Sequence, residues 1–300
     1  KNAYNIYLKA KEHSQTIQEK NDVNASIENL NKKHDFISSH KNYKFKRGSE
    51  KISCEPFFII GCGRSGSTLI RSILNANNNI SIPPENITLA NMISKYDNLN
   101  FIAWNDLVKS VLEDFENNPQ FPFWGLNIEK LYKKLIKIED KQRSLRKIID
   151  VIYMTFAKEN FPKATRWGDK TPLNSLNIRY IDQVFDNAKY IHLIRDGRDV
   201  VSSYLNSTTY VNDVEVASKR WLNHLKNAAL LGRNKDKDHY LEIYYEKFVS
   251  NPEKYTKKIC DFLGIDYNED MLNYKDDLSK LKDTKMKQHN NLRREINTDS

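Results

Sequence analysis

The sequence has no uninterrupted apolar stretch of the roughly 20 residues that a membrane-spanning helix needs, and it shows no signal-peptide pattern. Its longest apolar runs, such as FFII at residues 57–60, have the length of core strands. Long basic tracts are also absent, although the net charge is +9. These absences predict a chain without a membrane span and argue against a nucleic-acid polymer as the partner.

Cysteine is scarce, and the three cysteines, Cys54, Cys62 and Cys260, form no C-x-x-C pair. Cys54 and Cys62 flank a predicted strand, and eight extended residues span ~26 Å, whereas disulfide-linked Cα atoms lie within about 7 Å of each other. Reduced thiols are typical of a reducing compartment, so we expect a cytoplasmic protein. No Cys/His cluster or obvious acidic metal-binding set is recognisable, so we expect no metal.

Hydrophobic residues make up 39% of the 300 residues and aromatic residues 11%, enough for one packed domain with an extension. Residues 1–47 are polar and predict a helical N-terminal extension, while 48–300 form the domain. Short apolar runs at 51–60, 188–194 and 239–245 predict buried strands, and helical patterns lie between them. Strands separated by helices indicate an α/β fold, with a parallel sheet flanked by helices on both faces.

The stretch GCGRSGST, residues 61–68, joins the first of these strands to a predicted helix. Gly61, Gly66 and Thr68 have the spacing of a Walker A loop, but Ser67 replaces its lysine and Arg64 lies inside the loop. A glycine-rich turn before a helix presents main-chain N–H groups to an anion. The missing lysine argues against ATP or GTP hydrolysis, whereas an arginine suits a tetrahedral oxyanion group.

GCGRSGSTLIRSIL resembles the 5′-phosphosulfate loop of sulfotransferases, which use 3′-phosphoadenosine 5′-phosphosulfate (PAPS) and release PAP. YIHLIRDGRDVVSSY resembles the family's 3′-phosphate segment, with Arg195 and Ser203 as the phosphate-binding pair. The resemblance implies a P-loop-like sulfotransferase fold. It also implies a set of residues that bind PAPS: Gly63, Arg64, Ser65, Gly66, Ser67, Thr68, Arg195 and Ser203.

Two further segments are similar to the family, so that the resemblance covers about residues 55–300. RWGDKTP resembles a segment of tyrosylprotein sulfotransferases whose lysine approaches the sulfuryl group, which maps onto Lys170. YLEIYYEKF resembles a strand–helix unit whose tyrosine lines the nucleotide site, here Tyr245. The resemblance implies that Arg64 and Lys170 neutralise the charge that develops during transfer.

The general base is expected to be Glu85, which lies 21 positions beyond Arg64, the distance at which this branch of the family has a glutamate. Alternatively, Glu85 caps the helix that begins near Ile87. His192, within a predicted strand, and His224, on a helix where it could be a surface residue, are the other candidate bases.

The sequence departs from the tyrosylprotein branch in two places. Ser207 stands where that branch has a second phosphate-binding arginine, and Arg198 is a candidate to compensate. The last residues, REINTDS at 294–300, resemble the start of a C-terminal segment that completes the nucleotide pocket in bacterial relatives. We therefore expect the C-terminal pocket segment to be truncated.

The function predicted from the sequence is transfer of a sulfuryl group from PAPS to a hydroxyl or amine of a carbohydrate, a peptide tyrosine or a small molecule. One alternative is a P-loop nucleotide kinase or NTPase, with Asp196 as a Mg²⁺ ligand. The other is a non-catalytic module that binds anionic glycans. The sequence does not predict the acceptor or the oligomeric state.

Overall fold

The computed structural model describes three segments of the chain, residues 52–99, 102–207 and 213–275, and the single residues Glu28, Gly48 and Val211. The predicted N-terminal extension, residues 1–47, therefore lies outside the described residues except for Glu28. The predicted C-terminal pocket segment at 294–300 lies outside them as well.

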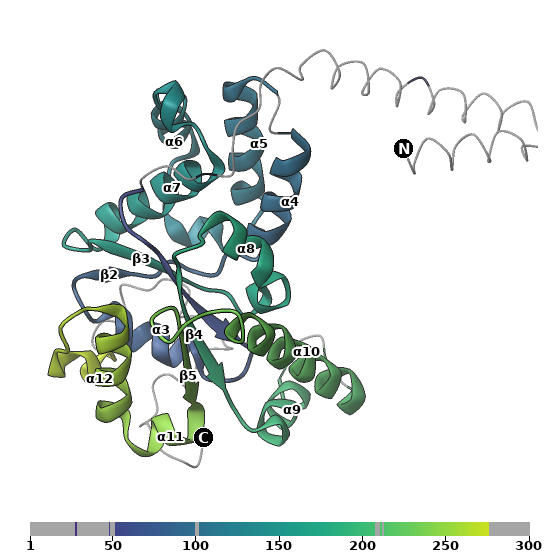
Figure 1. Ribbon diagram of the computed structural model, residues 1–300, viewed down its shortest axis with the longest axis vertical. Helices are drawn as coiled ribbons and strands as arrows, with labels where there is room; N and C mark the ends of the chain where they lie inside the picture. The colour runs from purple at the N-terminus through teal and green to yellow at the C-terminus, as the bar shows by residue number, and fades with distance from the viewer. Residues whose placement is uncertain are drawn as a thin grey trace, which may run out of the picture.

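Five parallel strands form one sheet in the order β2-β3-β1-β4-β5 (Figure 1). Their bounds are Phe57–Gly61 (β1), Ile80–Ser81 (β2), Arg166–Lys170 (β3), Lys189–Ile194 (β4) and Tyr240–Tyr244 (β5). The central strand β1 pairs with β3 on one side and with β4 on the other, so that Phe57 faces Gly168 and Lys189. The predicted α/β class with a parallel sheet is confirmed.

Helices connect the strands and cover both faces of the sheet. The α-helices are α3 (Ser67–Asn75), α4 (Leu89–Leu99), α5 (Trp104–Glu116), α6 (Ile128–Leu135), α7 (Leu145–Asn160), α8 (Ile178–Val184), α9 (Gly197–Leu205), α10 (Val214–Gly232), α11 (Tyr245–Ser250) and α12 (Pro252–Leu263). Short 3₁₀ helices are η1 (Phe121–Trp124), η2 (Asp140–Gln142), η3 (Pro172–Asn177) and η4 (Glu269–Asn273). None of the helices in the described ranges is both long and apolar enough to cross a membrane.

The side chains of β1 divide between two hydrophobic cores, because successive residues of a strand point to opposite faces. Phe58 and Ile60 pack with residues of α4, α5, α7 and α8. Phe57 and Ile59 pack with residues of α3, α11 and α12. A strand buried on both faces has the continuous apolar run FFII from which it was predicted.

The parallel strands bring the functional loops together at their carboxyl ends. In an open parallel sheet a ligand binds beyond the carboxyl ends of the strands, where the chain leaves neighbouring strands in opposite directions. Here the glycine-rich loop follows the central strand β1, and Lys170 ends β3. Arg195 follows β4 and Tyr245 follows β5.

The segment that leads from β2 to Glu85 is anchored on α3 by buried polar side chains. Asn75 donates to the carbonyl of Ile82 at 3.0 Å and accepts the Ile82 N–H at 2.8 Å. The Nε of Arg71 donates to the same carbonyl at 3.1 Å. The two-residue strand β2, which the sequence did not predict, is therefore fixed by side chains of a helix as well as by its pairing with β3.

Asn75→Leu tests this anchor, because it keeps the volume but leaves the buried N–H of Ile82 without an acceptor. We expect the free energy of unfolding to fall by about 2 kcal/mol, the cost of one unsatisfied buried group. Asn98→Leu is the control, since Asn98 is exposed and, among the described residues, donates within its own helix, to the carbonyl of Ser94. Urea denaturation should leave the control within about 0.5 kcal/mol of the wild type, and equal losses would show that Asn75 is no special anchor.

Candidate active site

The loop between β1 and α3 has a strained backbone packed tightly against its surroundings. Gly66 precedes α3 with φ 88°, and Arg64, with φ 69°, is the one non-glycine residue with positive φ in the described part of the chain. A Cβ atom on Gly66 would lie 2.4 Å from the ring of Tyr245, and one on Gly63 would lie 2.5 Å from the hydroxyl of Tyr204. Such strain persists only where the surrounding structure enforces it, and it is common at ligand sites.

One side of this loop carries a cluster of cationic and hydroxyl groups. The Nε of Arg64 donates to the hydroxyl of Ser203 at 3.0 Å. The guanidinium of Arg195 donates to the main-chain carbonyl of Arg64 at 3.2 Å and stacks 4.5 Å from the ring centroid of Tyr245. The structure thus brings together the residues predicted from two separate motifs, about 130 positions apart in the sequence.

A buried ion pair lies on the other side of the loop. The ammonium of Lys170, whose side chain is fully buried, forms a short ion pair with the Glu85 carboxylate, whose side chain is 20% exposed. The same ammonium lies 3.3 Å from the hydroxyl of Thr68. A buried ammonium is tolerated only when it is paired, so Glu85 and Thr68 are what allow Lys170 to lie at this depth.

Hydrogen bonds to its main chain hold Glu85 in place. Its N–H donates to the side chain of Gln120 at 3.0 Å, and its carbonyl accepts from Asn118 at 2.8 Å. The N–H of the next residue, Asn86, donates to the hydroxyl of Thr171 at 2.9 Å. The role of Glu85 as a cap for a helix beginning near Ile87 receives no support, because α4 begins at Leu89.

Both histidines that were alternative bases are buried. His192 is 1% exposed in β4, where its Nδ1 lies 2.6 Å from the hydroxyl of Tyr240, and burial lowers its pKa to about 4. His224 is completely buried on α10, which is contrary to the surface position considered for it, and burial lowers its pKa to about 4 as well. His192 thus occupies a core position within the strand that the sequence predicted.

The three cysteines are free, as predicted. Burial raises the pKa of the Cys54 and Cys62 thiols to about 11 and that of Cys260 to about 12. The thiol of Cys62 lies 3.7 Å from the Tyr204 hydroxyl beneath the loop. These thiols are structural, because a thiol with a raised pKa is a poor nucleophile.

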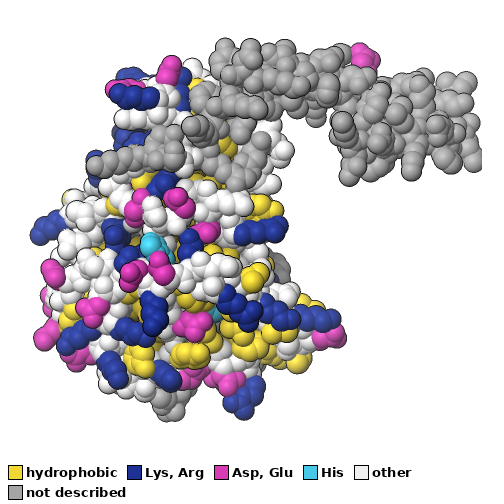
Figure 2. Space-filling model, viewed as in Figure 1, with side chains coloured by type: hydrophobic (Ala, Val, Ile, Leu, Met, Phe, Trp, Pro, Cys, Tyr) yellow, Lys and Arg dark blue, Asp and Glu magenta, His cyan; other side chains and the backbone are white. Residues whose placement is uncertain are grey.

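The donor set fits an anionic ligand. The hydroxyl of Ser65 is buried and has no hydrogen-bond partner among the residues that the structure describes. Arg64 and Arg195 present two guanidinium groups at one side of the loop, and Lys170 presents an ammonium at the other. This arrangement suits a ligand with two separated anionic groups. By contrast, Figure 2 shows basic and acidic side chains interspersed on the face that it displays, without a field of one sign.

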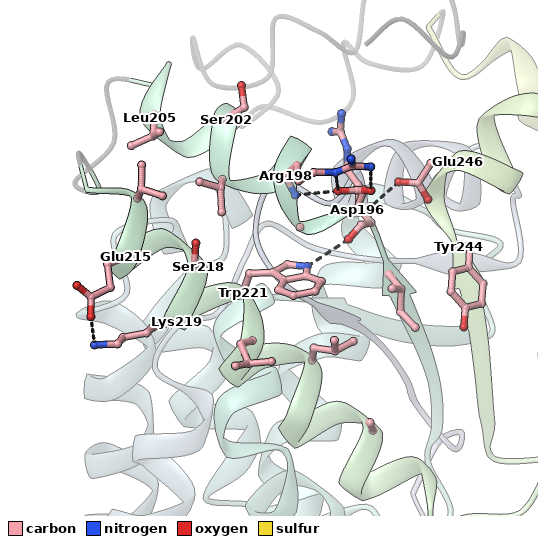
Figure 3. Close-up of a pocket in the computed structure, with 18 of the residues that line it drawn as sticks. Asp196, Arg198, Ser202, Leu205, Glu215, Ser218, Lys219, Trp221, Tyr244 and Glu246 are labelled. Carbon is pink, nitrogen blue, oxygen red and sulfur yellow. Dashed lines mark hydrogen bonds and ion pairs between the residues drawn. The ribbon is translucent and has the colours of Figure 1, made fainter.

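An open groove of about 1450 Å³ lies beside this cluster, between α9, α10 and the edge strand β5 (Figure 3). Its lining includes Trp221, whose indole N–H donates to the carbonyl of Arg195 at 3.2 Å. Arg198 lines it as well and pairs with Asp196. Glu85 and Lys170 do not line this groove. The sequence did not predict the groove.

Gln120 and Asn118, which support the site, were not predicted from the sequence. They bind the main chain of Glu85 but lie more than 30 positions away from it. No local sequence pattern marks them, because the tertiary fold brings them to Glu85.

Comparison with known proteins agrees with this geometry. A sequence model described as "Sulfotransferase family" matches residues 56–269. The chain is 26% identical over 228 residues to the protein-tyrosine sulfotransferase of Drosophila melanogaster, covering 74% of this chain and 40% of that protein. It is 24% identical over 231 residues to protein-tyrosine sulfotransferase A of Caenorhabditis elegans, covering 75% and 54%. It thus spans about half the length of these curated relatives.

A solved structure shares the fold. The sulfotransferase domain from the olefin synthase of Synechococcus PCC 7002 has a TM-score of 0.53 and is 28% identical. The match covers 77% of this chain and 80% of that domain.

Gly66→Ala tests whether the tight packing of the loop is needed to bind an anion. Gly264→Ala is a matched control, because Gly264 also has positive φ (70°) but has no atom near the Cβ that would be added. Both variants should lose about 1–2 kcal/mol from the unfavourable φ, and Gly66→Ala should lose a further ~1–3 kcal/mol from the clash with Tyr245. In calorimetry with inorganic pyrophosphate, binding should be lost in Gly66→Ala alone, and normal binding by this variant would contradict the assignment of the loop.

Proposed function

The chain belongs to the sulfotransferase family, and from this premise we propose that it transfers the sulfuryl group of PAPS to a hydroxyl group of an acceptor. The observation that carries the proposal is the division of polar groups about one loop. Arg64, Arg195 and Ser203 meet on one side, and the Lys170–Glu85 pair lies on the other. PAPS has anionic groups at both ends, a 3′-phosphate and a 5′-phosphosulfate.

Each side of the loop has a distinct proposed role. Arg195 and Ser203 would hold the 3′-phosphate, with the ring of Tyr245 beneath the guanidinium of Arg195. The main-chain N–H groups of residues 63–68, with the hydroxyl groups of Ser65, Ser67 and Thr68, would hold the 5′-phosphosulfate. When bound, PAPS supplies an activated sulfuryl group and leaves as PAP.

The chemical step is assigned to Glu85 and Lys170, and to Arg64 from within the loop itself. The Glu85 carboxylate would take the proton of the acceptor hydroxyl while the acceptor oxygen forms the new bond to sulfur. Lys170 and Arg64 would stabilise the negative charge that appears on the departing phosphate oxygen as the old S–O bond breaks. We propose that these cations neutralise the charge in place of a metal ion, so that the reaction requires no metal.

The acceptor is proposed to be a hydroxyl compound, with peptide tyrosine favoured by the names of the curated relatives. The exposed fraction of the Glu85 side chain leaves room for such a group to approach. Ser207, at the position where the sequence departs from the tyrosylprotein branch, is half-buried and donates to the carbonyl of Tyr204 at 2.8 Å.

The two alternative functions are less favoured by the geometry. The NTPase alternative needs Asp196 as a metal ligand, but Asp196 caps α9 and binds the guanidinium of Arg198, whose hydrogen bonds lower the pKa of Asp196 to about 2. A binding module for anionic glycans gives no role to the Glu85 carboxylate, which the proposed transfer reaction uses as a base.

Nucleotide selection provides the first test of this function. Because Arg195 and Ser203 should bind the 3′-phosphate, calorimetry should show much tighter binding of PAP than of 5′-AMP, which lacks that phosphate. Arg195→Ala should remove about 2–4 kcal/mol of this preference by taking away a charge-assisted contact. Arg179→Ala is the control, since Arg179 is exposed on α8 and contacts the ring of Tyr180. Equal affinity of the wild type for both nucleotides would reject the proposal.

The roles of Glu85 and Lys170 can be separated by kinetics. Glu85→Gln should lower kcat by roughly 10²–10⁴-fold with little change in PAP affinity, because the amide cannot take the proton. Lys170→Ala should depress kcat much more than it weakens PAPS binding, since charge builds up beside Lys170 in the transition state. Glu116→Gln, at an exposed position on α5, should behave as the wild type.

Chelation of metal ions tests whether the reaction requires a metal. EDTA should leave the turnover of the wild type intact if protein cations neutralise the charge. Loss of turnover on chelation, or near-normal turnover by Glu85→Gln, would contradict the proposed chemistry.

A further inference from the structure

The chain turns from β4 into α9 through the peptide group that joins Arg195 to Asp196. The pairing of β4 with β5 ends at Ile194 and Tyr244, and α9 begins at Gly197. This peptide group therefore lies between the end of a strand and the start of a helix. Main-chain N–H and C=O groups need hydrogen-bond partners, and those of this peptide must come from elsewhere in the fold.

Two side chains from other helices hold the peptide group. The indole N–H of Trp221, on α10, donates to the carbonyl of Arg195 at 3.2 Å. The carboxylate of Glu246, on α11, accepts the N–H of Asp196 at 2.8 Å. Figure 3 shows both contacts as dashed lines that reach the turn from different elements. Since the C=O and N–H of a trans peptide point in opposite directions, the peptide plane is held from both sides.

The neighbours of Trp221 and Glu246 explain how they reach this turn. A Cβ atom on Gly197 would lie 3.1 Å from the indole of Trp221, so the absence of a side chain there lets the ring lie against the main chain. Glu246 directly follows Tyr245, whose ring centroid lies 4.5 Å from the guanidinium of Arg195. Two successive residues of α11 therefore contact the side chain of Arg195 and the peptide group that follows it.

Rotation of this peptide group would move apart the two residues proposed to bind the 3′-phosphate. Arg195 follows β4, whereas Ser203 lies on α9, so the peptide group is the joint between them. Its plane sets ψ of Arg195 and φ of Asp196, the two dihedral angles that direct α9 away from the strand. In the structure both residues contact Arg64: the guanidinium of Arg195 donates to its carbonyl at 3.2 Å, and the Ser203 hydroxyl accepts from its Nε at 3.0 Å.

We propose that Trp221 and Glu246 are positioning residues, which together clamp this peptide group. By fixing it, they hold Arg195 and Ser203 at the separation that fits a 3′-phosphate. The part of this inference that concerns the nucleotide rests on the proposed function. Neither side chain is assigned a contact with PAPS. Their effect is on the selection of a nucleotide that carries a 3′-phosphate, and binding of the 5′ end by the glycine-rich loop does not depend on them.

The test replaces each clamp residue in the full chain. Trp221→Phe keeps an aromatic ring but lacks the N–H, and Glu246→Leu removes the acceptor oxygens at an exposed position, where folding should be unaffected. Trp104→Phe is the matched control, because the indole N–H of Trp104, on α5, also donates to a main-chain carbonyl, that of Leu135 at 3.1 Å. Calorimetry measures the affinities for PAP and 5′-AMP, and mass spectrometry measures amide hydrogen exchange of residues 194–199.

Both clamp variants should give the same pattern. Exchange of residues 194–199 should accelerate, because the Asp196 N–H is no longer held in a fixed peptide. The affinity for PAP should fall about 3–10-fold, as expected for the loss of one hydrogen bond, while the affinity for 5′-AMP stays within about twofold. General damage to the structure would weaken both nucleotides alike. Trp104→Phe should leave both affinities and the exchange of this segment unchanged.

A conservative variant and a double variant test whether the two contacts act on one group. Glu246→Gln keeps an amide oxygen as acceptor, so it should restore the slow exchange and the PAP affinity that Glu246→Leu loses. When Trp221→Phe and Glu246→Leu are combined, PAP affinity should fall by less than the product of the two single effects, because both contacts hold the same peptide group.

The outcomes separate this inference from the proposed function. If the wild type prefers PAP to 5′-AMP and both clamp variants retain that preference, the inference is overturned and the proposed function stands. Equal losses in Trp104→Phe, or unchanged exchange in both clamp variants, would overturn it as well. A wild type that binds PAP and 5′-AMP equally would refute the proposed function, and accelerated exchange in both clamp variants would then still support the clamp on the peptide group.

Discussion

Burial of the Lys170 ammonium is the constraint on which the arrangement of the site depends. An ammonium without access to water needs a carboxylate in contact with it, and the carboxylate must come from another part of the chain. Glu85 reaches it from the end of the two-residue strand β2, which lies at the edge of the sheet next to β3. The bonds from Asn75 and Arg71 to Ile82, and those from Asn118 and Gln120 to Glu85, all fix the course of this segment.

The parallel sheet supplies the rest of the geometry. Since all five strands run in one direction, the residues that follow them gather at the same edge: the glycine-rich loop, Glu85, Lys170, Arg195 and Tyr245. The loop lies at the centre because β1 does. This explains how one loop separates two chemical environments, a cationic cluster at Arg195 and a paired lysine at Lys170, which the proposed function assigns to the two ends of PAPS.

The sequence predicted those features that depend on local patterns. The run FFII and the glycines after it indicated a buried parallel strand and an anion loop, and the proximity of Arg195 and Ser203 to that loop followed from motif resemblance. Contacts set by tertiary packing could not be predicted in this way. His224 lies on a helix in which polar and apolar residues alternate irregularly, so its complete burial depends on how α10 packs against its neighbours. The burial of the Asp169 carboxylate is likewise set by packing, because the Tyr153 hydroxyl reaches it from α7.

The contacts between Glu85 and the stretch after α5 also have a consequence for protein engineering. Asn118 and Gln120 belong to the helical region between β2 and β3, in which the described residues form no strand. This region therefore supports the proposed base, Glu85, from outside the sheet. A chimaera that imports this region from another protein needs equivalents of Asn118 and Gln120 at the same distance from Glu85. Without them, a change meant for selectivity would first reduce the rate.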